Sequence, residues 1–174
     1  MIAVARPAVD EYAPAFADYV GRVGDDEDIL AVLSGQLDEV LAQLARVSEA
    51  RGGYRYAPGK WSIKEVIGHV TDAERVFCYR ALSFARGDKN PLPSFDEQAW
   101  APAGKFDARP LADLAAELDA VRRATIALFS GLPHDALARR GVASDNEVSV
   151  KSLAWIIAGH ERHHVAILRE RYLV

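Results

Sequence analysis

Residues 149–172 read SVKSLAWIIAGHERHHVAILRERY in a chain of 174 residues. Apolar residues recur in this stretch every three or four positions, which is the spacing of one face of an α-helix. The spacing predicts a helix from Ser149 to about Arg171. A helix with one apolar stripe has to bury that stripe against other elements of the fold. The stripe consists of Leu153, Ile156, Ile157, Ile167 and Leu168.

Three further segments carry apolar residues at the same spacing, at about 25–50, 62–86 and 110–130. Asp25 is the expected N-cap of the first segment, and Gly52 follows its end. No segment of comparable length alternates as a strand does, so we predict an all-α chain without strands. Because lateral packing buries four such stripes together, we predict a four-helix bundle.

The connections between the predicted helices differ in length. The one from Gly87 to Arg109 is long enough to cross the bundle, and its proline and aromatic content is typical of a packed loop, which we expect to cover one end of the bundle. Residues 1–23 are expected to form an arm that packs on the bundle, and residues 1–174 to form one domain. The aromatic residues of the arm are Tyr12, Phe16 and Tyr19.

The chain has 21 basic and 25 acidic residues, giving a net charge of −4. This balance argues against binding to nucleic acid, which relies on excess positive charge. The basic pairs Arg122-Arg123 and Arg139-Arg140 are interpreted as solvated helix faces. No long apolar run or signal peptide is visible, so we expect a cytoplasmic protein that does not enter a membrane.

Two histidines stand where leucines would be expected. His160 and His164 lie one helical turn apart at the centre of the apolar stripe. Unpaired imidazoles there cost free energy, and protonating both would place like charges in a low dielectric. A divalent cation binds a neutral nitrogen of each ring, and the spacing holds both rings on one side. We therefore predict a metal site; the alternative is a pair of hydrogen-bonded core histidines.

His69 is the expected third ligand. It lies at the edge of the apolar stripe of the 62–86 helix, and two nitrogens alone rarely hold a catalytic metal. His163 falls on the flank of its helix, where we expect packing or solvent exposure, and His134 is expected to be exposed in a turn. Cys78 is the only cysteine, which excludes an intrachain disulfide, and we interpret it as a small core residue.

Residues 160–164, HERHH, also fit the zinc-protease signature H-E-x-x-H. Such enzymes usually take a third ligand downstream, and few residues follow His164. No strand is predicted that could hold a peptide substrate. We therefore do not interpret the chain as a protease.

Three charged residues are candidates for chemistry near the histidines. Asp72, one turn beyond His69, and Glu161, beside His160, are the nearest carboxylates in sequence. Each is a candidate general base or hydrogen-bond partner of a ligand, with a salt-bridge or surface role as the alternative. Arg80 lies three turns beyond His69 at nearly the same azimuth. It could bind an anionic substrate if the pocket runs along the helix, and an ion pair is the alternative.

Two blocks of the sequence stand out, YAPGKWSIKEVIGH at 56–69 and GHERHH at 159–164. They are accompanied by DAER at 72–75, Arg80 and LRERY at 168–172. With these blocks the sequence resembles the DinB-like superfamily over nearly its whole length. The first two blocks together are fairly specific, whereas either alone would be weaker.

The resemblance implies a four-helix bundle of up-down-down-up order, with a long crossover between the second and third helices. It also implies a homodimer and a divalent metal, with zinc or nickel expected, on His69, His160 and His164. These are the residues that the spacing selects. Branches of the superfamily include metal-dependent hydrolases of the YfiT type and enzymes that transfer low-molecular-weight thiols such as bacillithiol or mycothiol.

The expected function is therefore hydrolysis of a small-molecule substrate by water that the metal activates. The first alternative is a metal-dependent S-transferase that uses a low-molecular-weight thiol. The second is a noncatalytic module that binds a metal or a small ligand.

Overall fold

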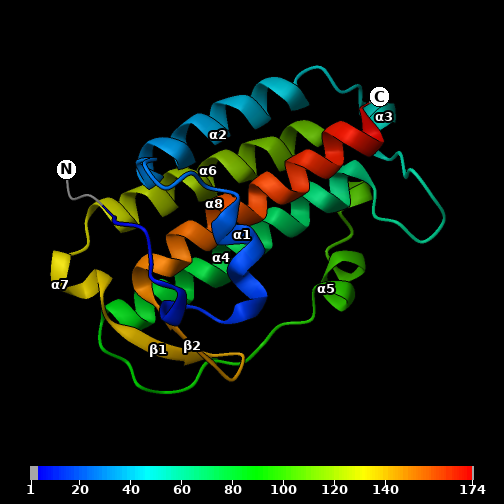
Figure 1. Cartoon of the computed structure of the whole chain (residues 1–174). Coiled ribbons are helices and arrows are strands. Elements are labelled where there is room, and N and C mark those ends of the chain that lie inside the picture. Colours follow the sequence, from blue (N-terminus) through cyan, green and yellow to red (C-terminus); the bar gives the residue numbers. More distant parts are fainter. Residues whose placement is uncertain (1–3, 174) are drawn as a thin grey trace.

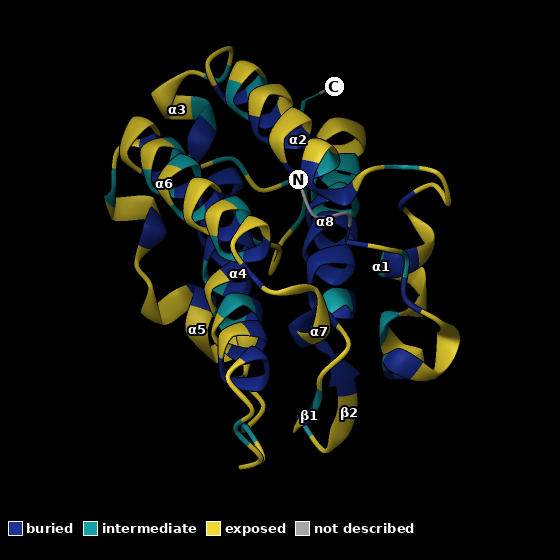
Figure 2. Cartoon of the chain, turned by 90° about the vertical axis from the view of Figure 1, so that its left-hand side faces the viewer, coloured by how far each residue is buried: buried dark blue, intermediate teal, exposed yellow. Residues whose placement is uncertain are grey.

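The computed structural model describes residues 4–173, and its frame is four long helices packed side by side (Figure 1). Their buried faces turn towards one another and their exposed faces outward (Figure 2). The predicted helical bundle is confirmed. None of the helices within residues 4–173 has the length and hydropathy needed to cross a membrane. The four helices are α2 (Ile29–Leu44), α4 (Ile63–Ala85), α6 (Leu111–Ser130) and α8 (Val150–Ile167).

The four helices follow the expected up-down-down-up order. The colours of Figure 1 show that α2 and α8 run one way and that α4 and α6 run the other way. Side-chain contacts agree: Arg122 of α6 bonds Glu74 of α4, and one turn further along both helices Thr125 contacts Cys78. Since α4 and α6 are parallel neighbours, the chain between them has to cross the bundle, which confirms the predicted crossover.

The first long helix is shorter than its periodicity predicts. It begins after Asp28, whose side chain accepts hydrogen bonds from two N–H groups of the first turn, so the predicted cap at Asp25 is wrong. Ser48 has an extended backbone and caps a separate short helix, α3 (Glu49–Gly52). Apolar residues keep their spacing across this break, which is why the sequence predicts one continuous helix.

Caps fix the starts of the two helices that matter most for the site. Ser62 and Glu65 form the predicted capping box at the start of α4, and Ser149 caps α8. α6 begins directly after Pro110. Beyond its last α-helical residue, α8 continues as a π-helical turn, Leu168–Tyr172.

A β-hairpin follows α7 (His134–Leu137), and the expectation of a chain without strands is wrong. Strands β1 (Arg140–Ala143) and β2 (Asn146–Ser149) pair antiparallel. Ser144 and Asp145 make the turn with φ values of 53° and 61°, the left-handed backbone that two-residue hairpin turns use. Strands this short show no alternating pattern that a sequence can reveal.

The connector at residues 86–110 is packed, as its composition indicates. It contains α5 (Glu97–Ala103), which contacts α4, and a short 3-10 turn. Phe106 of that turn is buried against Gly68 of α4, where an added Cβ would overlap its ring. Leu92 pairs with the end of β1. The connector therefore covers a side of α4 rather than only an end of the bundle.

The N-terminal segment packs on the bundle through α1 (Ala17–Gly21), which lies against α8. Val20 and Val23 are buried in the main core. Residues 1–3 of the predicted arm lie outside the described residues, and the assignment of the chain to one domain stays a prediction. Also packed against this core are Tyr12, Phe16 and Tyr19.

A buried polar layer lies between two apolar clusters of the core. Arg122 is fully buried and bonds to both Glu74 and Glu161. The layer consists of Glu74 of α4, Arg122 of α6 and Glu161 of α8. Along its helix, each of them lies between apolar residues of one cluster and apolar residues of the other. The interpretation of Arg122 as part of a solvated face is therefore wrong, whereas its neighbour Arg123 is exposed and pairs with Asp119.

Candidate metal centre

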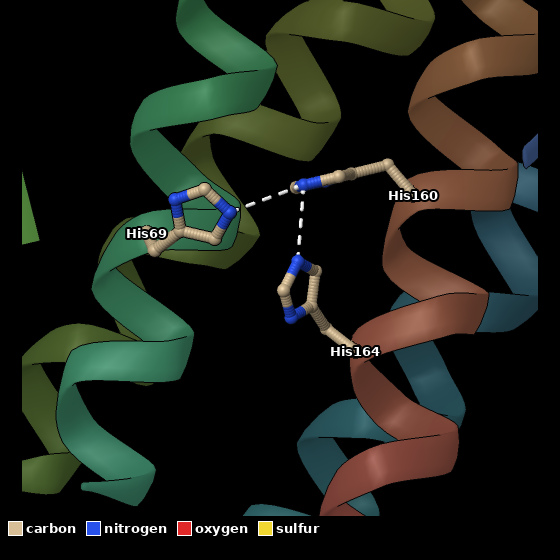
Figure 3. A group of neighbouring side chains, drawn as sticks. All are labelled: His69, His160 and His164. Atoms are coloured by element: carbon tan, nitrogen blue, oxygen red, sulfur yellow. Dashed lines mark hydrogen bonds between the residues drawn. The ribbon is translucent and has the colours of Figure 1, made fainter. Parts of the chain in front are cut away.

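Three histidines from two helices converge inside the bundle (Figure 3). His69 lies on α4, and His160 and His164 lie on α8. Nε2 of His160 lies 3.1 Å from Nε2 of His69 and 3.1 Å from Nε2 of His164. One nitrogen from each ring falls within 4.8 Å of the others. The structure brings together the three residues that the sequence spacing selects.

The starting points of the two helices explain this convergence. Ser149 begins α8, so the i, i+4 pair His160 and His164 falls on one side of that helix. Ser62 begins α4 and thereby sets His69 on the side that faces α8. The apolar residues around the histidines pack the facing sides of α4 and α8 against each other. The imidazole rings on these sides therefore lie in the interface between the two helices.

The three rings are neutral at pH 7. Burial lowers the pKa of His69 to about 4 and the pKa of His164 to about 3. Burial, together with the charge that the neighbouring rings would carry, holds the pKa of His160 well below its ordinary value. His69 is 7% exposed and His160 is 6% exposed. Each neutral ring keeps one nitrogen lone pair that can bind a cation.

Hydrogen bonds alone do not satisfy the three rings. Nε2 of a neutral imidazole is either a donor or an acceptor, so Nε2 of His160 can pair with one neighbour at a time. The other 3.1 Å contact is left without a hydrogen bond. Nitrogens held at about 2.0–2.1 Å from one tetrahedral ion lie about 3.3 Å apart, close to the two distances that join His160 to His69 and to His164. The donor set therefore fits a divalent cation.

We expect the metal-free protein to lose stability as the pH falls from 6.5 to 4. The pKa values of His69 and His164 in the folded chain, about 4 and about 3, lie below the ordinary value of 6.5 for histidine. In this window the unfolded chain binds more protons than the folded chain, so acid favours unfolding, and the stability is complete above pH 6.5. The loss should be on the order of 3 kcal/mol for each of these two rings by pH 4. Urea unfolding at successive pH values measures it.

Two variants test the origin of this pH dependence. His69→Gln should reduce the slope between pH 6.5 and 5, where few carboxylates titrate, and the remaining slope comes from the other buried rings. His134→Gln should keep the full slope, because His134 is exposed. A slope that is the same in wild type and His69→Gln would contradict the assignment to the buried rings.

A pocket of about 350 Å³ opens onto the histidines. Its wall is largely aromatic: the ring of Tyr19 lies 5.3 Å from that of His160, and the ring of Trp61 lies 4.8 Å from that of His69. Glu97 of α5 adds a carboxylate to the wall. The N-terminal arm, α4, the connector and the hairpin all contribute to it. The pocket therefore depends on segments far apart in the sequence.

The sequence did not identify Tyr19, Trp61 or Glu97 as site residues. Helical periodicity relates residues within one helix, whereas these three come from the arm, from the loop before α4 and from α5. The available signal was the aromatic content of the arm and the connector. That signal indicates packing and gives no reason to connect either segment with the histidines.

Neither of the two predicted carboxylates lines the histidine pocket. Glu161 is 2% exposed and bonds to Arg122 in the polar layer, on a different face of α8 from His160. Asp72 pairs with Arg75, with an N–O distance of 3.3 Å, and burial raises its pKa. The salt-bridge alternative therefore describes both carboxylates. The expectation that Asp72 or Glu161 acts as a general base or hydrogen-bond partner at the histidines is not supported, because both carboxylates lie outside the pocket.

The other predicted residues are placed as follows. Arg80 lines the pocket together with His69, but no carboxylate among residues 4–173 pairs with it, so the ion pair considered for it is absent. His163 is half-buried, with its ring 5.5 Å from that of Tyr19. His134 is exposed, as expected.

Cys78 behaves as a core residue. Its Sγ lies 3.1 Å from Oγ1 of Thr125, and burial raises the pKa of its thiol to about 11. A thiol with so high a pKa is a poor nucleophile at neutral pH. This environment agrees with its interpretation as a small core residue.

The sequence has recognisable relatives. The profile of the DinB superfamily matches residues 33–168. The "Putative metal-dependent hydrolase OB0413" of Oceanobacillus iheyensis is 29% identical over 116 residues, which are 66% of this chain and 66% of that protein. The match thus spans just under two thirds of the length of that relative.

Solved structures share the fold. YfiT from Bacillus subtilis, described as a probable metal-dependent hydrolase with an unusual four-helix bundle topology, is similar with a TM-score of 0.74 at 19% identity, over 97% of this chain and 95% of that chain. The mycothiol-dependent maleylpyruvate isomerase is similar with a TM-score of 0.66 at 16% identity, over 79% of this chain and 58% of that chain. At these identities the similarity establishes the architecture and leaves the chemistry to the site.

Proposed function

This chain belongs to the DinB superfamily, and from that premise we propose that it is a metal-dependent enzyme that hydrolyses a small molecule. The observation that carries the proposal is the convergence of three neutral imidazole nitrogens, from two buried rings and the half-buried ring of His164, on a pocket open to small molecules. A curated relative named as a metal-dependent hydrolase supports it.

His69, His160 and His164 would hold the ion. A divalent ion with three protein ligands keeps positions open for water or substrate and lowers the pKa of a water molecule there. Because all three rings are neutral at pH 7, they can bind a cation without first losing a proton. We propose zinc or nickel, since imidazole nitrogen suits both.

Glu97 is the carboxylate that we assign as general base. It lines the pocket of the histidines and is exposed to solvent. Its negative charge acts on His69, whose pKa it raises against the larger opposing effect of burial. Its carboxylate would accept the proton of the attacking water. Glu161 is unsuited to this role because Arg122 holds its carboxylate in the polar layer.

Transfer of a low-molecular-weight thiol is the second candidate function. The mycothiol-dependent maleylpyruvate isomerase has the same fold, and a three-nitrogen site with open positions can also take a thiolate. Homodimer formation, a small-molecule substrate and a cytoplasmic location stay predictions.

Metal content tests the three-histidine site. The purified protein should contain close to one divalent ion per chain, and His164→Ala should lose most of it. His163→Ala is the matched control, because His163 is the adjacent residue and lines the pocket but lies outside the three-nitrogen cluster. It should keep the metal. Equal metal content in wild type and His164→Ala would refute the site.

Activity assays distinguish the candidate functions. Metal-loaded protein is offered small esters and amides, with and without bacillithiol and mycothiol. Hydrolysis that needs no thiol and stops on chelation supports the proposal, whereas turnover that requires a thiol supports the second candidate. If protein with a full metal content turns over none of these, it is a binding module and the enzymatic proposal is overturned.

A further inference from the structure

Arg80 is a buried cation without an ionic partner in the described structure. It lies on α4 and is 3% exposed. Its Nη2 donates to the backbone oxygen of Pro93 and to Oγ of Ser144, both at 2.9 Å. Its Nε is buried and has no hydrogen-bond partner among residues 4–173. No carboxylate in this part of the chain forms a salt bridge with it, unlike Arg122, which has two.

Such an environment is costly for a guanidinium group. An arginine stays protonated under all ordinary conditions, so it carries its charge into the protein interior. Buried charges are usually paired, because an ion loses its favourable hydration when it leaves water. The rings of Phe77 and Phe95, each 6.0 Å from Cζ, offset only part of this cost. The two neutral oxygens that it contacts carry no charge to balance its own.

Arg80 and the histidines belong to the same pocket. Both line the cavity of about 350 Å³. The ring of Phe77 lies between them, 5.9 Å from the ring of His160 and 6.0 Å from Cζ of Arg80. The pocket thus has three nitrogen ligands at one end, a cation at the other and an apolar wall between. Glu97 also lines it, but Glu97 is exposed and forms no salt bridge with Arg80.

We propose that Arg80 binds an anionic oxygen group of the substrate, a carboxylate or a phosphate. The substrate class is then a small molecule with one such group, an apolar or aromatic body that packs on Phe77 and Phe95, and a reacting bond at the histidine end. A guanidinium group pairs with the oxygens of either anion. The reacting end rests on the proposed hydrolytic function, whereas the anion site needs no metal.

Calorimetric titration of the purified protein with three ring compounds tests this proposal. Benzoate and phenyl phosphate carry the two candidate anions, and benzamide is the neutral control. At least one anion should bind tenfold more tightly than benzamide, and the tighter of the two identifies the anionic group. Arg80→Gln should lose this preference, while Arg123→Gln should keep it, since that change removes the same charge from an exposed site. No preference in the wild type, or the same preference in Arg80→Gln, would overturn the proposal.

Two further measurements keep the test decisive. Arg80→Gln loses the bonds to Pro93 and Ser144 and could misfold, so the Nε–Hε resonance of Arg80 is also followed in the wild type by ¹⁵N NMR, with Arg80→Lys used for its assignment. It should shift with the preferred anion and not with benzamide; an unmoved resonance overturns the proposal. Metal content of folded Arg80→Gln should equal that of the wild type, and the anion preference should survive in His164→Ala. Metal content thus tests the metal site and anion preference tests the Arg80 site, so the failure of one proposal can be distinguished from the failure of the other.

Discussion

Arg122→Met should destabilise the protein by about 3–5 kcal/mol, the range for removing one partner of a buried ion pair. The guanidinium group of Arg122 is fully buried, bonds Glu74 at 2.9 and 2.8 Å, and also contacts Glu161. Its loss would leave two carboxylates, 2% and 3% exposed, without their cation. Methionine has a similar length, so the cavity it leaves is small. Urea unfolding followed by circular dichroism measures the change.

Two matched variants separate charge pairing from other effects of the substitution. Arg123→Met alters the next residue, which is exposed, and should have no measurable effect. Glu161→Gln removes one charge but leaves Arg122 bonded twice to Glu74, so its effect should be clearly smaller than that of Arg122→Met. A loss of stability below about 1 kcal/mol in Arg122→Met would mean that the buried ion pairs stabilise the protein no more than a surface salt bridge does, and would contradict this account.

The histidine cluster could be predicted because its signal lies within single helices. His160 and His164 are an i, i+4 pair inside an apolar stripe, and a helix with that periodicity has to place them on its buried side. The Ser62 and Glu65 capping box fixed the register of α4 and therefore the direction of His69. The imidazole rings on the facing sides of two helices then had to contact one another, or their nitrogens would have been left without a bonding partner.

The environments of Arg122 and Glu161 could not be predicted in this way. A charged residue is usually solvated, and the spacing within α6 contains no sign that Arg122 meets Glu74, which is 48 residues away. The polar layer exists only when three helices supply its members together. Within this layer Glu161 is a partner of Arg122 and not a base at the histidines.

The predicted helix boundaries are wrong where local hydrogen bonds, and not the apolar periodicity, decide where a helix begins. Asp28 and Ser48 each bond to the N–H groups that follow them, and these bonds decide where α2 and α3 begin. The hairpin turn at Ser144 and Asp145 lacks the glycine that usually marks such a turn. The wall of the histidine pocket contains residues of the arm, the connector and the hairpin. Which residues line the pocket therefore depends on the whole fold and cannot be predicted from any one stretch of sequence.

Gly159→Ala should also destabilise the protein strongly. A Cβ at Gly159 would lie 1.8 Å from the backbone oxygen of Tyr19 and 2.4 Å from its carbonyl carbon. Because the obstacle is backbone, no side-chain rotation relieves the overlap, and α1 has to move away from α8, beside which it lies in Figure 2. Overpacking of this kind costs about 1–3 kcal/mol, and sometimes more. The packing of Val20 would be lost in addition.

The same movement should open the wall of the histidine pocket, since the ring of Tyr19 lies 5.3 Å from that of His160. Chymotrypsin, which cuts after aromatic residues, should therefore cleave the arm faster in Gly159→Ala than in the wild type. Gly35→Ala is the matched control: nothing lies within 4 Å of its added Cβ, so the change should stabilise α2 by about 0.5–1 kcal/mol. Wild-type unfolding and wild-type resistance to cleavage in Gly159→Ala would refute the close approach of α1 to α8, and with it the place of Tyr19 in the pocket wall.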